Sequence, residues 1–102
     1  MTNKNYVAGR NFESRFLADL KKRGKSIKGG RFYGSKGITD VWWVNPKGEH
    51  HEAQLKYSRK KPYIAPHEMQ ELRQFSRDMN GKILVWLVKK QARKTIEMEL
   101  VV

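Results

Sequence analysis

The chain has 102 residues, and its 38% hydrophobic and 11% aromatic residues fit a single folded domain over residues 1–102 rather than a disordered tail. No apolar run is long enough to cross a bilayer, and the first residues lack the apolar stretch of a secretory signal. We therefore expect a soluble protein of the cytoplasm, or of the host cytoplasm if its origin is viral, with no membrane partner. The absence of cysteine excludes disulfides and thiolate metal sites.

The charge of the chain is strongly positive. It contains 22 Lys and Arg against 10 Asp and Glu, which gives a formal net charge of +12. A surplus of this size favours a polyanionic partner, usually nucleic acid, because each basic group placed at a phosphate releases counterions. The alternative is a basic surface that serves only solubility. The basic residues are spread along the chain rather than lining one amphipathic helix, which disfavours binding to a membrane surface.

The first half of the chain predicts one helix followed by strands. In residues 9–22, apolar side chains recur at helical spacing and a glycine follows them, at Phe12, Phe16, Leu17, Leu20 and Gly24. Residues 25–37 are rich in glycine and basic side chains, which suits a short strand followed by a mobile loop. The β-branched and aromatic segment 38–44 predicts a strand, closed by a turn at 45–48.

The second half predicts a strand, a helix and two further strands. Residues 52–57 continue as a strand, and a helix is expected to begin at Pro66 and to end before Gly81. Residues 82–88 are almost all apolar, as in a strand covered on both faces, and residues 95–102 alternate as in a half-solvated strand. The predicted order is α-β-β-β-α-β-β, an α/β fold in which helices flank a mixed five-stranded sheet.

Two acidic residues stand at positions where acids are uncommon. On the predicted first helix, Glu13 falls within the apolar arc, and an ionised carboxylate turned toward a core is costly unless it is paired. Asp40 lies within an otherwise apolar strand, where Asp is depleted. The structural alternatives are an edge-of-core Glu13 paired with Lys or Arg, and an Asp40 in a turn just before the strand begins.

The strand that follows carries polar groups on one face. Because side chains alternate along a strand, Glu52, Gln54 and Lys56 point to the same side. With Glu13 and Asp40, the amide oxygen of Gln54 would complete an oxygen-lined site beside Lys56, suited to Mg²⁺ or to Mn²⁺ as a substitute. Such a site could hydrolyse phosphodiesters, with the metal activating a water and the lysine positioning that water or stabilising negative charge.

Three other features are disfavoured as functional sites. His50 and His51 are adjacent and would point to opposite faces of a strand, so no histidine metal site is expected. The chain has no GxxxxGK[ST] pattern, which argues against a nucleotide cofactor. Trp42, Trp43 and Trp86 are interpreted as core or interface residues rather than as base-stacking platforms.

Four segments carry the motifs of a known family. They are GRNFE at 9–13, RFYGSKGITD at 31–40, QLK at 54–56 and ELRQFSRDMNGKILVWLV at 71–88. Together they span most of the chain, and they resemble the archaeal-type Holliday junction resolvases of the PD-(D/E)xK nuclease superfamily. The resemblance implies a restriction-endonuclease-like fold.

The resemblance also implies an activity, that of a metal-dependent endodeoxyribonuclease that nicks opposing strands of four-way DNA junctions as a homodimer. Segment 71–88 would contribute to the dimer interface, and Ser35 would approach the scissile phosphate from its loop. The implied catalytic residues are Glu13, Ser35, Asp40, Gln54 and Lys56, and the implied metal ligands are Glu13, Asp40 and Gln54. The residues that could face the junction DNA are Arg10, Arg31, Lys36, Arg59, Lys60 and Lys61.

One position departs from the family pattern, because Gln54 stands where the family has a metal-binding carboxylate. Gln54 could be a tolerated ligand in an active enzyme, Glu52 could contribute from further along the strand, or the protein could bind junctions without cutting them. The other motif residues are in place, so we expect an active enzyme. Its rivals are a nuclease of the same superfamily acting on flaps, mismatches or duplex DNA, and a non-catalytic junction-binding protein.

Overall fold

The computed structural model describes residues 4–32 and 37–102, with the backbone alone described for residues 4–10. Its elements in chain order are α1 (Lys4–Lys22), β1 (Lys28–Arg31), β2 (Val41–Val44), β3 (His50–Ser58), α2 (Pro66–Asp78), β4 (Ile83–Gln91) and β5 (Ile96–Leu100). The predicted order α-β-β-β-α-β-β is confirmed. Within the described part of the chain, no helix is both long and apolar enough to span a membrane.

Several element boundaries differ from those that the sequence predicts, and two of these differences bear on the candidate site. Helix α1 begins at Lys4, earlier than predicted, because the prediction rested on the apolar side chains from Phe12 onward. Strand β2 begins only at Val41, so Asp40 lies immediately before the strand, as the alternative interpretation had it. The backbone N–H of Asp40 nevertheless donates to the carbonyl of Ala53 at 2.8 Å, so this residue is fixed against β3.

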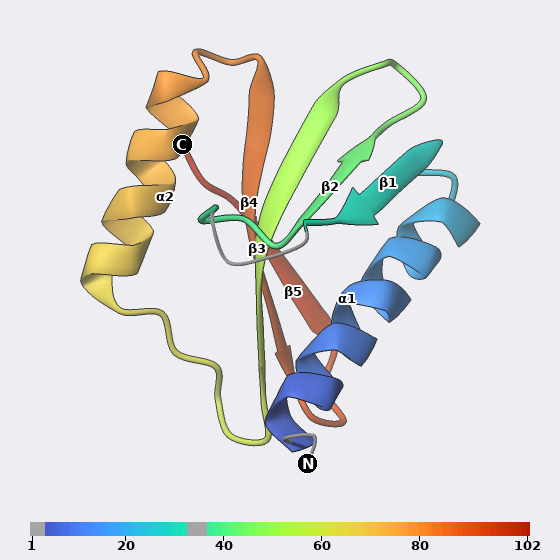
Figure 1. Ribbon diagram of the computed structural model, residues 1–102, viewed down its shortest axis with the longest axis vertical. Helices are drawn as coiled ribbons and strands as arrows, with labels where there is room; N and C mark the ends of the chain where they lie inside the picture. Colours follow the sequence, from blue (N-terminus) through green and yellow to red (C-terminus); the bar gives the residue numbers. More distant parts are fainter. Residues whose placement is uncertain (1–3, 33–36) are drawn as a thin grey trace.

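The strands form one sheet in the order β1-β2-β3-β4-β5 (Figure 1). Neighbouring strands are antiparallel except β3 and β4, which run parallel and are connected through α2. A parallel pair needs such a crossover, because its second strand must start at the end of the sheet where the first one started. β3 is the third of the five strands and so lies at the centre of the sheet. In its parallel register with β4, Gln54 lies beside Leu87.

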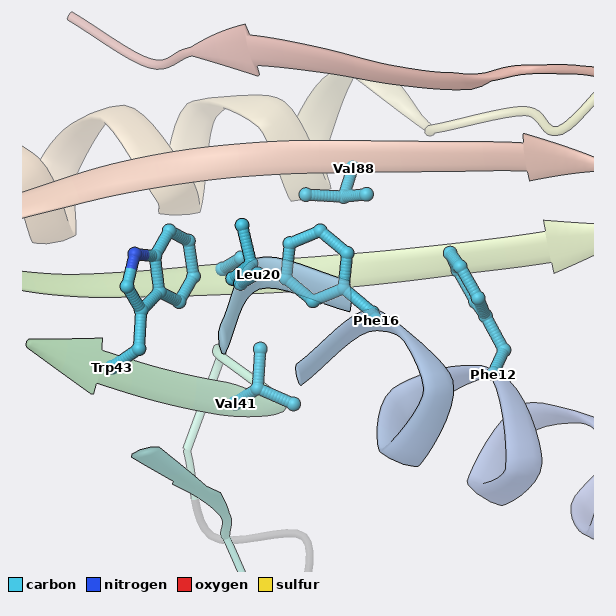
Figure 2. Packing of buried hydrophobic residues seen from close by; sticks show 7 residues of the cluster. Phe12, Phe16, Leu20, Val41, Trp43 and Val88 are labelled. Carbon is cyan, nitrogen blue, oxygen red and sulfur yellow. The ribbon is translucent and has the colours of Figure 1, made fainter. Parts of the chain in front are cut away.

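Helix α1 supplies the core on one face of the sheet. Its Phe12, Phe16 and Leu20 pack with Val41 and Trp43 of β2 (Figure 2). The rings of Phe16 and Trp43 meet edge to face with their centroids 5.6 Å apart, a favourable aromatic geometry. The helical spacing seen in the sequence therefore marks the residues that attach α1 to the sheet.

Helix α2 supplies the core on the opposite face. Its Leu72, which is fully buried, packs with Val85 and Leu87 of β4. Since side chains alternate along a strand, β3 turns the buried Ala53 toward α1 and the polar Gln54 toward the face that carries α2. The two helices thus divide the sheet into a face that is mainly core and a face that also carries polar side chains of β3.

Strand β5 is more exposed than its alternating pattern predicts. Met98 and Leu100 lie opposite Val88 and Trp86 in the register, yet they remain 41% and 39% exposed. Helix α1 contacts β1, β2 and β3, and α2 contacts β4, so neither helix covers β5 in the described structure. We call Met98 and Leu100 the β5 apolar patch.

Candidate functional site

Glu13 projects from α1 toward the end of β1. Its Oε2 lies 3.7 Å from Nη1 of Arg31, and both side chains are about three-quarters buried, with 25% and 28% of their surface exposed. Burial raises the pKa of Glu13, nearby Asp40 raises it further, and Arg31 acts in the opposite direction. The structural alternative, an edge-of-core Glu13 paired with an arginine, is therefore present, and the Asp40 carboxylate lies within electrostatic range of Glu13.

Asp40 is held against β3 by its side chain as well as by its backbone. Its Oδ2 accepts a hydrogen bond from the backbone N–H of Leu55 at 2.8 Å. Burial raises the pKa of Asp40, while the Leu55 hydrogen bond and the charge of Lys56 lower it. The carboxylate is therefore fixed in orientation and lies within the electrostatic range of both Glu13 and Lys56.

Gln54 lies between Ala53 and Leu55, the two residues of β3 that bond to Asp40. Its Oε1 atom is buried and has no hydrogen-bond partner among the described residues. A buried polar oxygen without a partner carries a desolvation cost of about 1–3 kcal/mol. An acceptor left in this state suits a site that is completed by a bound cation.

Lys56 points to the same side of β3 as Gln54 and meets the first turn of α2. Its Nζ lies 2.6 Å from Oε2 of Glu68. The side chain of Lys56 is 28% exposed to solvent and that of Glu68 is 27% exposed. The hydrogen bond from Lys56 is the largest cause of a lowered pKa for Glu68. Glu68 carried no distinctive signal in the sequence, because an acid in the first turn of a helix is common for reasons of capping alone.

Glu52 is engaged elsewhere on the same face. One of its carboxylate oxygens accepts a hydrogen bond from Oγ1 of Thr39 at 2.6 Å, and the other lies 3.1 Å from Nε2 of His50. Thr39 precedes Asp40, so these contacts fasten the segment that carries Asp40 to β3. The geometry favours a supporting role for Glu52 over its use as a metal ligand.

The donor set fits a divalent cation. Among the described residues, no three His, Cys, Asp or Glu side chains are grouped so that they could hold a metal ion. The candidate ligand oxygens are the carboxylates of Glu13 and Asp40, which interact electrostatically, and the buried amide oxygen of Gln54, which has no partner within the described part of the chain. These are hard oxygen donors of the kind that Mg²⁺ and Mn²⁺ take. A cation here would offset the repulsion between the two carboxylates and give the Gln54 oxygen a partner.

The predicted DNA-facing residues fall into three groups. Arg59, Lys60 and Lys61 are exposed directly after β3, on the chain that leaves Lys56. The side chain of Arg10 and the whole of Lys36 lie outside the described residues. The predicted catalytic residue Ser35 also lies outside them. Arg31 is the partner of Glu13.

A separate groove lies on the face of the sheet that carries α1. It has a volume of about 960 Å³ and its apolar lining includes Phe16, Trp43, Trp86 and Met98. None of the predicted metal ligands lines it. The groove is therefore a different feature of the molecule from the polar cluster, by which we mean Glu13, Asp40, Gln54 and Lys56.

No protein-family model matches the sequence, and no curated protein matches it significantly. Among solved structures, the chain is similar to Hjc from the archaeal hyperthermophile Archaeoglobus fulgidus, a Holliday junction resolvase determined at 1.6 Å resolution. The TM-score is 0.71 at 21% sequence identity, and the match covers 92% of this chain and 73% of that chain. The chain therefore has the fold of a Holliday junction resolvase, and the resemblance noted in the sequence is confirmed for the fold.

We predict that Asp40→Asn stabilises the folded protein at neutral pH. Burial places the pKa of Asp40 above its ordinary value, so the ionised form costs stability above that pKa, and the cost disappears as the pH falls toward the unfolded-state value. Asn keeps an acceptor for the Leu55 N–H and removes the charge. Thermal melts at neutral and acidic pH should show a higher Tm for the variant at neutral pH and a smaller difference in acid.

Asp78→Asn is the matched control, because Asp78 is exposed near the end of α2. It should change the Tm little at either pH. A lower Tm for Asp40→Asn than for the unchanged protein at neutral pH would show that the charge of Asp40 is compensated by contacts other than those described.

Proposed function

We propose that the protein is a structure-specific endodeoxyribonuclease that resolves four-way DNA junctions by metal-dependent paired nicking of opposing strands. The observation that carries the proposal is the placement of the Asp40 carboxylate by the Leu55 N–H, close to Glu13 and within the field of Lys56. The shared fold of a Holliday junction resolvase supports branched DNA as the substrate. The net charge of +12 supports a nucleic-acid substrate independently of the fold.

In this proposal, Glu13, Asp40 and Gln54 hold Mg²⁺, or Mn²⁺ as its substitute. When bound, the ion supplies Lewis acidity and lowers the pKa of a water molecule. Asp40 has its orientation fixed by the Leu55 hydrogen bond, which limits the freedom of the site before substrate arrives. The ammonium group of Lys56 then stabilises negative charge that develops on the scissile phosphate.

The remaining site residues are assigned by resemblance and by exposure. Ser35 would approach the scissile phosphate, and the DNA backbone would be contacted by basic side chains. Arg59, Lys60 and Lys61 support this role because they are exposed next to the end of β3, where the strand carrying Lys56 finishes. Arg10, Arg31 and Lys36 would complete the basic surface.

We also propose that the protein acts as a homodimer, since paired nicks require two sites. The resemblance assigns the interface to segment 71–88, but the exposed side chains of α2 within that segment are polar or charged. They are Glu71, Arg73, Gln74, Arg77 and Asp78. Exposed apolar side chains lie instead on β5, next to β4, so the β5 apolar patch supports an interface on this side of the sheet.

The activity is tested with a synthetic four-way junction, a flap, a mismatched duplex and a linear duplex, each incubated with the protein and Mg²⁺. We expect paired nicks in the junction alone. Lys56→Ala should reduce the rate by at least about 100-fold while leaving a gel shift of the junction nearly unchanged, because the loss of an interaction made in the transition state lowers turnover and not substrate binding. Cutting of the other substrates favours a different nuclease of this fold, and a shift without cutting favours a junction-binding protein.

We predict that Gln54→Glu increases the affinity for Mg²⁺. A carboxylate adds negative charge at a position that now has a neutral amide with an unpartnered buried oxygen. The Mg²⁺ concentration that gives half-maximal cleavage should fall, and Gln74→Glu, which adds the same charge on the exposed face of α2, should leave it unchanged. An identical Mg²⁺ requirement in Gln54→Glu would remove this residue from the ligand set.

We predict that Met98→Glu shifts the protein from dimer to monomer. The substitution places a charge in the β5 apolar patch, where the side chain is 41% exposed in the single chain and would be desolvated in a dimer. Light scattering should give the 12.0 kDa mass of one chain for this variant and twice that mass for the unchanged protein. Glu97→Gln, on the opposite side of β5, is the control and should remain a dimer. An unchanged dimer in Met98→Glu would place the interface elsewhere.

A further inference from the structure

We propose that Glu68 is a positioning residue that holds the ammonium group of Lys56 next to Asp40 without letting it pair with that carboxylate. The proposal rests on the proposed function, because it concerns how Lys56 is presented at the metal site. Glu68 itself touches neither the metal ligands nor the reacting phosphate in this scheme. It acts through Lys56.

The contact joins two different elements at a short distance. Nζ of Lys56, on β3, lies 2.6 Å from Oε2 of Glu68, in the first turn of α2. The pair is about three-quarters buried on each side, with 28% and 27% exposure, so water screens it less than a pair on the open surface. The position of the lysine head group is therefore set by α2 as well as by its own strand.

Glu68 is itself anchored at the start of α2. Its other oxygen, Oε1, faces the backbone N–H of Ala65 at 3.4 Å, at the amino end of the helix where negative charge is favoured. The pKa of Glu68 is lowered chiefly by its hydrogen bond from Lys56, so the carboxylate remains ionised through the neutral range. A charged acceptor at a fixed helix terminus is suited to hold a flexible lysine in one place.

The alternative partner for Lys56 is Asp40. The positive charge of Lys56 lowers the pKa of Asp40, so the two side chains interact electrostatically. The ion pairs between described residues nevertheless include Lys56–Glu68 and none between Lys56 and Asp40. A lysine that moved onto Asp40 would bring a positive charge to a carboxylate that is needed for the metal, and it would compete with the cation. Glu68 gives the ammonium group a closer acceptor and thereby leaves the Asp40 carboxylate available.

The proposal predicts a coupling between Glu68, Lys56 and the metal. Without the charge of Glu68, Lys56 turns toward Asp40, and the protein then needs more metal to fill the site. If Lys56 is absent, the identity of residue 68 ceases to matter. A merely structural ion pair would instead change stability and leave the metal requirement unaltered.

The experiment compares the unchanged protein with Glu68→Gln, Lys56→Ala and the double variant. Gln preserves the length of the side chain and an acceptor for the Ala65 N–H, and it removes the charge. Binding of Mn²⁺ without DNA is measured by electron paramagnetic resonance, and junction cleavage in Mg²⁺ is measured in single-turnover reactions. Glu71→Gln is the matched control, because Glu71 is exposed on the same helix.

We expect Glu68→Gln to raise the Mn²⁺ concentration for half-saturation several-fold and to slow cleavage about 10- to 100-fold, the range seen when a residue that supports a metal site is lost. Glu71→Gln should stay within about twofold of the unchanged protein on both measures. In the Lys56→Ala background, Glu68→Gln should alter Mn²⁺ binding by less than about twofold, because its effect passes through the lysine.

Two results would overturn the proposal. One is Mn²⁺ binding by Glu68→Gln equal to that of the unchanged protein; the other is an equal loss of Mn²⁺ affinity with and without Lys56. Glu68→Asp serves as a second variant if Glu68→Gln melts at a much lower temperature, and it should retain more Mn²⁺ affinity than Gln because it keeps the charge. If the unchanged protein cuts no DNA, the proposed function fails, and the Mn²⁺ comparison still decides the role of Glu68.

Discussion

The hydrogen bond from the Leu55 amide to the Asp40 carboxylate, 2.8 Å long, is the contact on which the candidate site depends. Asp40 lies just before β2, in a segment without the full ladder of a strand, and this bond ties its side chain to the central strand of the sheet. Because the donor is a backbone group inside a hydrogen-bonded sheet, the orientation of the carboxylate does not depend on a mobile side chain. The same strand carries Gln54 and Lys56, so one contact fixes Asp40 relative to both.

The polar cluster around this bond is costly to the folded chain on its own. Burial raises the pKa of Glu13 and of Asp40, and the charge of Asp40 raises the pKa of Glu13 further. The Oε1 atom of Gln54 is buried without a partner among the described residues. A chain selected only for stability would replace such groups with apolar ones, whereas groups of this kind are retained where a site requires them.

The two faces of the sheet differ in the side chains that they carry. The face beneath α1 holds the aromatic core of Phe12, Phe16 and Trp43, together with the groove beside β5. The face beneath α2 holds the apolar contacts of Leu72 and, at the carboxyl end of β3, the polar groups. The Lys56–Glu68 pair connects these polar groups to α2, so the helix that completes the parallel crossover also borders the candidate site.

Local pattern in the sequence was sufficient for most of the fold. The apolar spacing from Phe12 onward marked α1, Pro66 marked the start of α2, and the β-branched and apolar runs marked the strands, because these signals depend on neighbours within a few residues. The start of α1 was missed because residues before Phe12 do not show that spacing. The exposure of β5 was missed because alternation shows which side chains share a face and not whether a helix covers that face.

The sequence by itself determined the residue types of the candidate site: acids at positions 13 and 40 that suit neither a core nor a strand, and an amide and a lysine on one face of β3. Only the tertiary structure decided that the Asp40 carboxylate bonds to Leu55, next to Gln54, and lies within electrostatic range of Glu13, since these residues come from segments far apart in the chain. It also decided that Glu52 contacts Thr39 and His50. The ion pair between Lys56 of β3 and Glu68 of α2 likewise depends on how the helix packs against the sheet. Periodicity records which way a side chain points along its own element, whereas partners on other elements depend on how strands and helices pack together.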